Sequence, residues 1–203
     1  MKSKRKKIGM VLIGFGALAL IGAAGLHLSN QLEEDNAARV SEQTAQALVE
    51  LISADKPEND QPAEQIILGE DDKETPLIEV AGEHYIGVLS IPALQLTLPV
   101  NDTWSYPKLR VSPCRYSGEA ADNTLSIAAH NYKNHFGRIA ALATGEPIVF
   151  TDTFGTEYDY TIAEIETVEP TEVVKVVDSM ADLVLFTCNY DGSARVLVKC
   201  MRQ

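Results

Sequence analysis

Residues 183–200 of this 203-residue chain read LVLFTCNYDGSARVLVKC, a pattern that predicts a β-hairpin. Two runs of mostly apolar and β-branched residues flank Asp191-Gly192, a dipeptide typical of a tight turn between antiparallel strands. If the turn is centred on that dipeptide, opposed residues have numbers that sum to 383, as 191 and 192 do. Cys188 and Arg195 meet this condition, so we expect them on one face of a hairpin, with Cβ atoms about 5 Å apart.

The expected pairing of Cys188 with Arg195 favours nucleophilic chemistry. A guanidinium beside a thiol stabilises the thiolate, which is the nucleophilic form. The same group offers hydrogen-bond donors to an oxyanion that forms at an attacked carbonyl. A longer or bulged loop would break the strict register, but it could still keep the two residues close.

The chain has three cysteines, and strand alternation separates two of them. Cys200 falls on the opposite face from Arg195, together with Val196 and Val198, and we expect it in the core. Cys114 follows a proline, and its position stays open between a buried site, an exposed site and the edge of a cleft. An odd number of cysteines without a Cys-x-x-Cys pair argues against a disulfide framework and against a zinc ribbon.

A cysteine that expels an amine needs a proton donor, and His130 is the first candidate. It ends the apolar run 124–129, where a strand opens into a loop, so its backbone is fixed while its side chain can point into a cleft. His135 lies in the loop that follows and is the second candidate. The other histidines, His27 and His84, lie at the end of an N-terminal apolar run and at the edge of the expected domain.

The rest of the C-terminal part has a strand-rich pattern. Short runs with β-branched or aromatic residues are separated by turn residues, and the predicted strands are Tyr85–Ile91, Leu96–Val100, Thr124–Ala129, Pro147–Thr151, Tyr158–Val168, Val173–Val177, Leu183–Cys188 and Ala194–Met201. Only residues 136–144 have a helical pattern. This arrangement predicts an all-β sandwich or closed barrel with one or two short helices.

The N-terminus predicts a membrane anchor. Lysines and one arginine in residues 2–7 precede an uncharged apolar run over residues 8–26, which is long enough to cross a bilayer core of about 30 Å. Acidic residues follow at 33–35, so the positive-inside rule puts the N-terminus in the cytoplasm and the later residues outside, as a single-pass membrane protein. A secretory signal peptide cleaved near the small residues 23–25 is the alternative.

Two segments join this anchor to the strand-rich domain. Residues 30–53 are rich in Ala, Glu, Gln and Leu and predict a helix, which we expect to be a solvated stalk, although it could also pack on the domain or pair with a second chain. Residues 54–80 carry prolines and many acidic residues and predict a flexible linker. The predicted organisation is therefore a basic tail and transmembrane anchor over residues 1–29, the stalk, the linker and a catalytic domain over residues 81–203.

The chain is acidic, with a net charge of −12 and a pI of about 4.7. A protein that binds nucleic acid needs a basic face, so this class is excluded. The acidic residues of the domain are scattered, without a spacing that would hold calcium. We therefore expect neither a metal nor a cofactor.

Three stretches of the chain resemble motifs of the sortase family. The stretch VLFTC at 184–188, with Arg195 after it, is similar to the family's Thr-Leu-x-Thr-Cys…Arg motif. The stretch IAAH at 127–130, followed by Phe-Gly at 136–137, is similar to its Ala-Gly-His motif. The stretch IGVLSIP at 86–92 resembles the family's first strand.

The resemblance covers roughly residues 82–203, with two departures from the motifs. Val184 stands where the first Thr is usual, and Ala129 replaces the Gly before the histidine. The seven positions from the cysteine to the arginine imply a short final loop.

By this resemblance, the fold is an eight-stranded closed sortase-type β-barrel, and the protein is a membrane-anchored cysteine transpeptidase. Cys188 would form a thioacyl-enzyme with a sorting signal of the Leu-Pro-x-Thr-Gly type, carried by surface proteins. His130 would protonate the departing amine and later accept a proton from the incoming one, and Arg195 would stabilise the oxyanion or hold the substrate backbone. The acceptor would be an amine of a peptidoglycan precursor or a pilin lysine.

The resemblance also implies a substrate-binding groove beside the nucleophile. In the family the connection that corresponds to residues 169–182 helps to form this groove. Val173, Val174 and Val176 could line it, or they could belong to the core. Thr187 could donate a hydrogen bond to the substrate, or it could simply close a strand as a β-former.

Two other functions stay open as alternatives. One is a cysteine peptidase without transfer activity. Papain-like enzymes place the cysteine before the histidine, whereas His130 precedes Cys188 here, and the chain lacks the Ser-His-Gly-Cys-type motif of L,D-transpeptidases. The other is an anchored module that only binds peptide, and the presence of all three catalytic residue types speaks against it.

Overall fold

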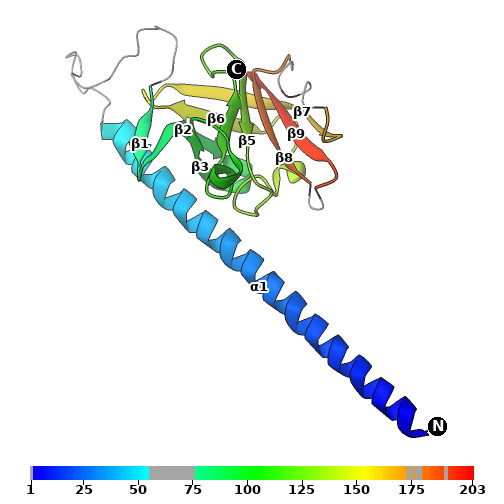
Figure 1. Cartoon of the computed structure of the whole chain (residues 1–203). Coiled ribbons are helices and arrows are strands. Elements are labelled where there is room, and N and C mark those ends of the chain that lie inside the picture. Colours follow the sequence, from blue (N-terminus) through cyan, green and yellow to red (C-terminus); the bar gives the residue numbers. More distant parts are fainter. Residues whose placement is uncertain (1, 55–75, 173–175, 177–179, 190–191) are drawn as a thin grey trace, which may run out of the picture. The chain divides into compact units, whose positions relative to one another are not determined.

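The computed structural model describes residues 2–54, 76–172, 176, 180–189 and 192–203, and Figure 1 shows their elements. The strands are β1 (Ile78–Val80), β2 (Glu83–Ile91), β3 (Leu96–Asn101), β4 (Cys114–Ser117), β5 (Leu125–Ala128), β6 (Pro147–Asp152), β7 (Glu157–Val168), β8 (Leu183–Cys188) and β9 (Arg195–Arg202). The helical elements are α1 (Lys2–Ala54), η1 (Pro92–Leu94), α2 (Tyr106–Leu109) and η2 (Ile139–Ala141).

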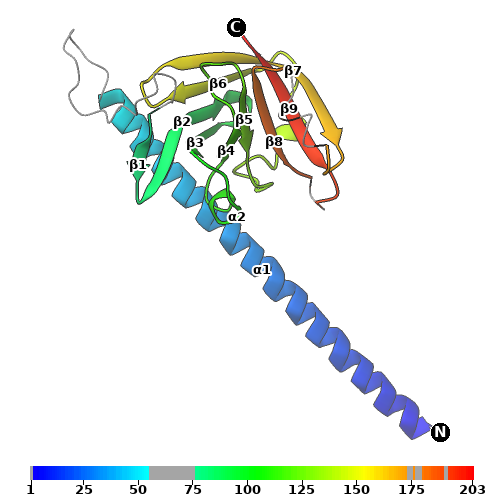
Figure 2. The ribbon, with the colours of Figure 1, turned by 45° about the horizontal axis from the view of Figure 1, so that its top comes forward.

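Eight of the strands in the described part of the chain close into a barrel. Their order is β2-β3-β4-β5-β8-β9-β7-β6, and β6 pairs back with β2. β1 extends this sheet as a hairpin with β2. The pairs β3–β4 and β5–β8 are parallel, and Figure 2 shows β5, β8 and β9 side by side on the wall of the barrel. The predicted closed eight-stranded barrel is therefore confirmed.

Gly87 allows the barrel to close at the seam between β2 and β6. It pairs with Asp152 of β6 and has a φ of +148°, a conformation that L side chains rarely adopt. A Cβ atom at this position would lie 2.1 Å from the carbonyl oxygen of Thr151. Glycine is therefore the residue that lets the two backbones approach at the seam.

Alternating strand residues fill the interior of the barrel. Leu185, Val198 and Cys200 of the final hairpin are fully buried in this core. Leu185 and Val198 oppose each other in the ladder, as the turn at residues 191–192 predicts. The prediction that Cys200 is a core residue is also confirmed.

The prediction of a helix over residues 136–144 is wrong. This segment consists of turns and the short 3-10 helix η2. The backbone N–H groups of His135 and Gly137 both donate to the carbonyl of Tyr132, at 2.9 Å each. These two bonds turn the chain tightly just before the segment, where a regular helix would need bonds to successive carbonyls.

Other differences from the expected elements concern short segments. β1 and β4 have three and four residues, too few for a two-residue period to be visible in the sequence. The strand expected over residues 173–177 is not found at Val176, which is helical. The rest of that expected strand, and residues 55–75 of the expected linker, lie outside the described residues.

α1 is one continuous helix, divided between two compact units of residues 1–36 and 37–203. The first unit exposes a series of large apolar side chains: Met10, Ile13, Phe15, Leu18, Leu20, Ile21, Leu26 and Leu28. By length and composition the helix can cross a membrane. The first unit is therefore a candidate membrane anchor.

The C-terminal part of α1 belongs to the second unit and packs on the outside of the barrel. Leu48 and Ile52 are buried in a cluster with Tyr85 and Val88 of β2. The expectation of a solvated stalk is therefore wrong for residues 37–53, and the alternative of packing on the domain is correct. The physical reason is the apolar stripe of this segment, which the barrel removes from water.

Candidate active site

Cys188 and Arg195 face each other across the last two strands. Cys188 ends β8 and pairs with Arg195, the first residue of β9, in the antiparallel ladder. The register predicted from the turn is therefore confirmed. The pairing continues one step into the loop, because the Asn189 N–H donates to the Ala194 carbonyl at 3.0 Å.

His130 lies beside Cys188 on the other side of β8. In the parallel pair β5–β8, Ala128 is the partner of Phe186, so partners are 58 positions apart (186 minus 128). The ladder ends at this pair, but the Ala129 N–H still donates to the Phe186 carbonyl at 3.2 Å, so the same spacing carried two positions further brings His130 level with Cys188. Neighbouring chain segments in a sheet are about 4.8 Å apart. His130, Cys188 and Arg195 therefore form a row across three adjacent segments of the barrel wall.

All three side chains of this row face outward. Val196 of β9 points into the core, so its neighbour Arg195 points outward, and the ladder partner Cys188 shares that face. Ala129 belongs to the core, so His130 also points outward. Each of the three residues is half-buried. The thiol, the imidazole and the guanidinium therefore lie on one solvent-facing surface.

Two hydrogen bonds hold the histidine segment against the cysteine segment. The Thr187 hydroxyl donates to the Ala129 carbonyl at 2.8 Å, and the Asn131 amide donates to the Asn189 carbonyl at 3.2 Å. The two bonds bracket the candidate histidine and the candidate nucleophile. Thr187 is 4% exposed and lies on the inner face, so its hydroxyl, one of whose two possible roles was a contact with substrate, has its partner within the protein.

The loop after His130 contributes two rings, those of Tyr132 and His135, that lie in sequence next to the His130 imidazole. The Tyr132 ring stacks on His130, with centroids 4.5 Å apart and planes 7° apart, and His135 lies 5.6 Å from the Tyr132 ring. His135 is fully buried, and this burial, with the nearby charge of His130, lowers the pKa of His135 to about 4. His135 is therefore neutral at physiological pH and lies out of reach of a substrate, which leaves His130 as the candidate acid and base.

The guanidinium of Arg195 contacts the hairpin loop. Its Nη1 atom donates to the carbonyls of Ala194 and Gly192, at 3.1 and 3.3 Å. The same side chain borders a recess of about 40 Å³. The residues that line the recess are Tyr116, Val168, Glu169, Pro170, Glu172, Val176, Phe186 and Arg195. Most of these residues are apolar or aromatic, and Arg195 and two glutamates are the charged members of the lining.

A second apolar cluster adjoins the recess on the outer face of the barrel. Its buried members are Val168, Val176, Val184 and Leu197. The Ser126 hydroxyl of β5 donates to the Val176 carbonyl at 3.2 Å, which ties the connection between β7 and β8 to the barrel wall. Of the three valines expected to line a groove, Val176 lies here, and Val173 and Val174 lie outside the described residues.

Cys188 differs from the other two cysteines in its surroundings. Cys114 and Cys200 are fully buried, and burial raises the pKa of each thiol to about 12. These two thiols therefore stay protonated at neutral pH. Cys188 is partly exposed on the outer face, so it is the thiol that a substrate can reach.

An acidic side chain of the recess accepts a hydrogen bond from the backbone. The Glu172 carboxylate accepts a hydrogen bond from the Glu169 N–H at 3.0 Å. Among the residues that the structure describes, no group of three or more His, Cys, Asp or Glu side chains is placed to hold a metal ion.

Aromatic residues that the sequence motifs did not predict lie beside the site. Tyr116 of β4 packs edge-on against Phe186 of β8, with centroids 5.1 Å apart, and Phe186 shares the outward face of Cys188. Trp104 lies next to Tyr116, with centroids 5.7 Å apart. The available signal was the concentration of Trp104, Tyr106 and Tyr116 in a segment without strand periodicity.

Comparisons with known proteins agree with this architecture. A family model described as Sortase domain matches residues 89–203. The chain is similar to sortase A of Listeria monocytogenes, with a TM-score of 0.54 and 20% identity over 59% of this chain and 87% of that one. It is also similar to sortase C1 of Streptococcus agalactiae (TM-score 0.54, 21% identity, 62% and 70% covered).

Sortase C of Clostridium perfringens SM101 is similar over a longer part of the chain, with a TM-score of 0.51 and 21% identity over 84% of this chain and 89% of that one. At 20–21% identity, these solved structures support the assignment of the fold alone. No protein with a curated description matches the chain.

Proposed function

The chain belongs to the sortase family of cysteine transpeptidases, and we propose that Cys188 is its nucleophile, His130 its acid and base, and Arg195 its oxyanion-stabilising residue. The observation that carries the proposal is the ladder pairing of Cys188 with Arg195, together with the two hydrogen bonds that hold the His130 segment along the other edge of β8. A thiol flanked by an imidazole and a guanidinium has a proton carrier on one side and a positive charge on the other. Acyl transfer through a cysteine needs both.

Acylation starts when the Cys188 thiolate attacks the carbonyl carbon of the cleaved peptide bond. The carbonyl oxygen becomes negatively charged, and N–H groups of Arg195 donate to it. Protonated His130 then gives its proton to the amine nitrogen as the C–N bond breaks. The amino-side part of the peptide remains as a thioester on Sγ, and the carboxyl-side part leaves as a free amine.

Transfer runs through the same groups in the opposite direction. An incoming amine attacks the thioester carbonyl, His130 accepts a proton from it, and the C–S bond breaks to return the thiolate. Because His130 and Arg195 lie on opposite sides of Cys188, proton transfer and oxyanion binding do not compete for the same space.

Thr187 would act by position rather than by contact with substrate. Its hydroxyl is directed to Ala129, so we assign it the role of holding the histidine segment beside the nucleophile. Val176 borders the recess and would line the substrate cleft, and we extend the same proposed role to Val173 and Val174 of that connection.

The donor substrate would be a surface protein with a C-terminal sorting signal of the Leu-Pro-x-Thr-Gly type. The recess beside Arg195 supports this proposal because Phe186, Tyr116 and Val176 offer apolar contacts to leucine and proline side chains. The acceptor would be an amine of a peptidoglycan precursor or a pilin lysine.

The N-terminal helix would anchor the enzyme as a single-pass membrane protein. The basic residues 2–7 would stay in the cytoplasm, and the barrel would lie outside, where surface proteins and cell-wall amines are found. The exposed apolar side chains between residues 10 and 28 support the proposal that lipid surrounds this segment.

The test uses the full chain in detergent micelles. It is incubated with a library of fluorogenic Leu-Pro-x-Thr-Gly peptides, with and without a glycine-based or lysine-based amine, and the intact mass is followed. We expect cleavage, a thioester adduct on the unchanged chain and an amide product when the amine is present. Cys188→Ala should form no adduct, and His130→Ala and Arg195→Ala should lower kcat by about 100-fold or more.

Cys114→Ala serves as the matched cysteine control, and it should still form the adduct because its thiol is buried. Cleavage without amide product, with either amine, would replace the proposal with a peptidase. Peptide binding without any adduct would replace it with a binding module.

A further inference from the structure

A row of aromatic rings leads from the strand of the nucleophile to the surface. Phe186 meets Tyr116 edge-to-face at 5.1 Å, and Tyr116 lies 5.7 Å from Trp104. Trp104 in turn meets Tyr106 edge-to-face at 5.9 Å. Because Tyr116 also lines the recess beside Arg195, the row is continuous with the proposed active site.

The outer end of this row is open to solvent. Trp104 is 43% exposed and Tyr106 is 76% exposed, whereas Tyr116 and Phe186 are half-buried. The barrel core does not use these outer rings, which lie outside its buried cluster. Neighbouring exposed aromatic side chains of this size are typical of binding surfaces.

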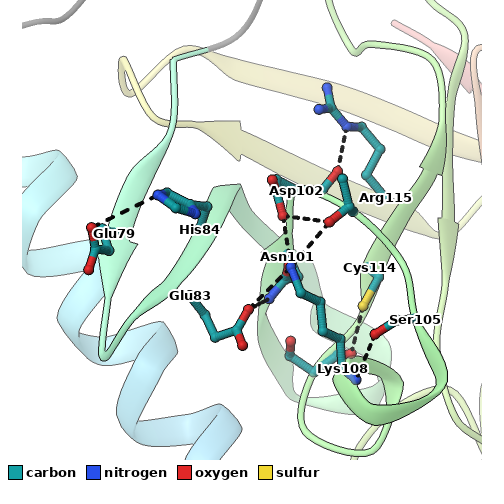
Figure 3. Close-up of polar contacts among 11 residues, drawn as sticks. Glu79, Glu83, His84, Asn101, Asp102, Ser105, Lys108, Cys114 and Arg115 are labelled. Carbon is teal, nitrogen blue, oxygen red and sulfur yellow. Dashed lines mark hydrogen bonds and ion pairs between the residues drawn. The ribbon is translucent and has the colours of Figure 1, made fainter.

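The loop that carries the outer rings is fixed by a polar cluster around Lys108, which Figure 3 shows. The Lys108 ammonium donates to the Asn101 side-chain oxygen at 2.7 Å. It also pairs with the carboxylates of Asp102 and Glu83, at 3.1 and 3.2 Å. The loop between β3 and α2 is thus joined to both β2 and β3.

Further bonds hold the same loop from its other sides. The Ser105 hydroxyl caps α2 by accepting from the Lys108 N–H at 3.3 Å. The Arg115 side chain of β4 donates to the Asp102 carbonyl at 2.9 Å, and the Asp102 N–H donates to the His84 carbonyl at 3.0 Å. A loop held in this way loses little conformational entropy when a ligand binds to it.

We infer that Trp104 and Tyr106 form an aromatic platform that binds the donor peptide on the amino side of its sorting motif. The inference rests on the proposed function, because the donor is the peptide whose carbonyl reaches Cys188. The platform would extend peptide recognition beyond the motif itself, to the residues that precede it.

The geometry favours the donor peptide as the occupant. Phe186 and Tyr116 line the recess, and Tyr116 also contacts Trp104, so a donor peptide whose amino-side residues occupy the recess would reach the platform next. The ring-to-ring steps of 5.1 and 5.7 Å correspond to about three extended residues at about 3.4 Å each. Exposed aromatic surfaces bind extended peptides that contain proline, since a proline ring packs on an aromatic face.

Trp104 is the single tryptophan of the chain, so its fluorescence reports directly on the platform. The full chain with Cys188→Ala is titrated in micelles with two tryptophan-free peptides. One begins at the leucine of the best Leu-Pro-x-Thr-Gly motif from the library, and the other carries Pro-Ala-Pro-Ala before that leucine. We expect a saturable change in Trp104 emission that is larger, and reached at lower concentration, with the extended peptide.

Steady-state kinetics provide the second measurement. Trp104→Ala in the otherwise unchanged chain should raise KM for the extended peptide about two- to tenfold, leave kcat unchanged and leave KM for the short peptide unchanged. Lys108→Ala, which keeps the tryptophan but frees its loop, should raise the same KM. Phe154→Ala is the matched control, because Phe154 is 51% exposed and lies in the turn between β6 and β7.

The outcomes separate this inference from the proposed function. Thioester formation with equal KM values for both peptides, and no change in Trp104 emission, would overturn the inference and leave the catalytic proposal intact. A saturable emission change without any thioester on the unchanged chain would support the platform and overturn the catalysis. An emission change with the acceptor amine alone, and none with the donor peptides, would overturn the inference in favour of an acceptor site.

Discussion

The hydroxyl of Thr187 donates a 2.8 Å hydrogen bond to the carbonyl of Ala129, so the residue before the proposed nucleophile holds the residue before the proposed acid. The bond crosses the parallel pair β5–β8 just beyond its last ladder partners. On the far side of the two catalytic candidates, Asn131 and Asn189 are joined in the same way. The spacing between thiol and imidazole therefore depends on side-chain bonds as well as on the sheet.

Thr187→Val removes this bond while it keeps the shape of the side chain. The buried Ala129 carbonyl then loses its hydrogen-bond donor, the Thr187 hydroxyl. This loss should lower the free energy of unfolding by about 1–3 kcal/mol. We expect kcat for thioester formation to fall and KM to change little, because the substrate does not touch Thr187. Thr187→Ser should restore most of kcat. A rise in KM with unchanged kcat would instead indicate direct contact with the substrate.

Tyr132→Leu removes the ring that stacks on His130 at 4.5 Å. The face of an aromatic ring attracts a cationic group by about 0.5–2 kcal/mol and also limits its rotation, so kcat should fall by up to about tenfold. Tyr132→Phe keeps the ring and should keep most of the activity. The measurement is the single-turnover rate of thioester formation. Equal rates for the leucine and phenylalanine variants would show that the stack does not contribute.

Burial of His135 makes stability depend on pH. Its pKa is lowered from 6.5 to about 4, so the unfolded chain binds a proton in this window and the folded chain does not. The free energy of unfolding therefore has its full value above pH 6.5, where the imidazole is neutral in both states. It falls by up to about 3 kcal/mol as the pH is lowered towards 4. The measurement is denaturant unfolding of the full chain, followed by Trp104 fluorescence.

His135→Leu supplies the control for this pH dependence. Carboxylates titrate in both proteins, so the difference between the two curves isolates the histidine. We expect that difference to change steeply between pH 6.5 and 4 and to be constant above pH 7. Parallel curves throughout this range would mean that His135 is protonated equally in the folded and unfolded chains.

Packing of residues 37–54 on the barrel predicts a stability effect far from the active site. Leu48 is fully buried, and Leu48→Ala should lower the free energy of unfolding of residues 37–203 by about 2–4 kcal/mol. Leu51 lies on the same helix but is 47% exposed, so Leu51→Ala should change it by less than about 0.5 kcal/mol. Equal effects of the two variants, measured by denaturant unfolding, would indicate that the helix does not pack on the barrel in solution.

The final hairpin and the pairing of Cys188 with Arg195 could be predicted from the amino-acid sequence alone. Both depend on local chemistry, because a turn dipeptide sets the register and a two-residue period assigns each side chain to a face. The same reasoning placed Cys200 in the core. It also identified the apolar N-terminal helix, since length and hydrophobicity suffice for that prediction.

Contacts between residues far apart in the chain could not be predicted from the sequence and are visible only in the folded protein. The contact of Tyr116 with Phe186 and the bond of Thr187 to Ala129 each join segments more than 50 positions apart, and no period in either segment predicts them. The packing of residues 37–54 likewise depends on contacts with distant residues. Their apolar stripe is compatible with a solvated stalk, a second chain or the barrel, and only the shape and apolar surface that β2 presents select the barrel.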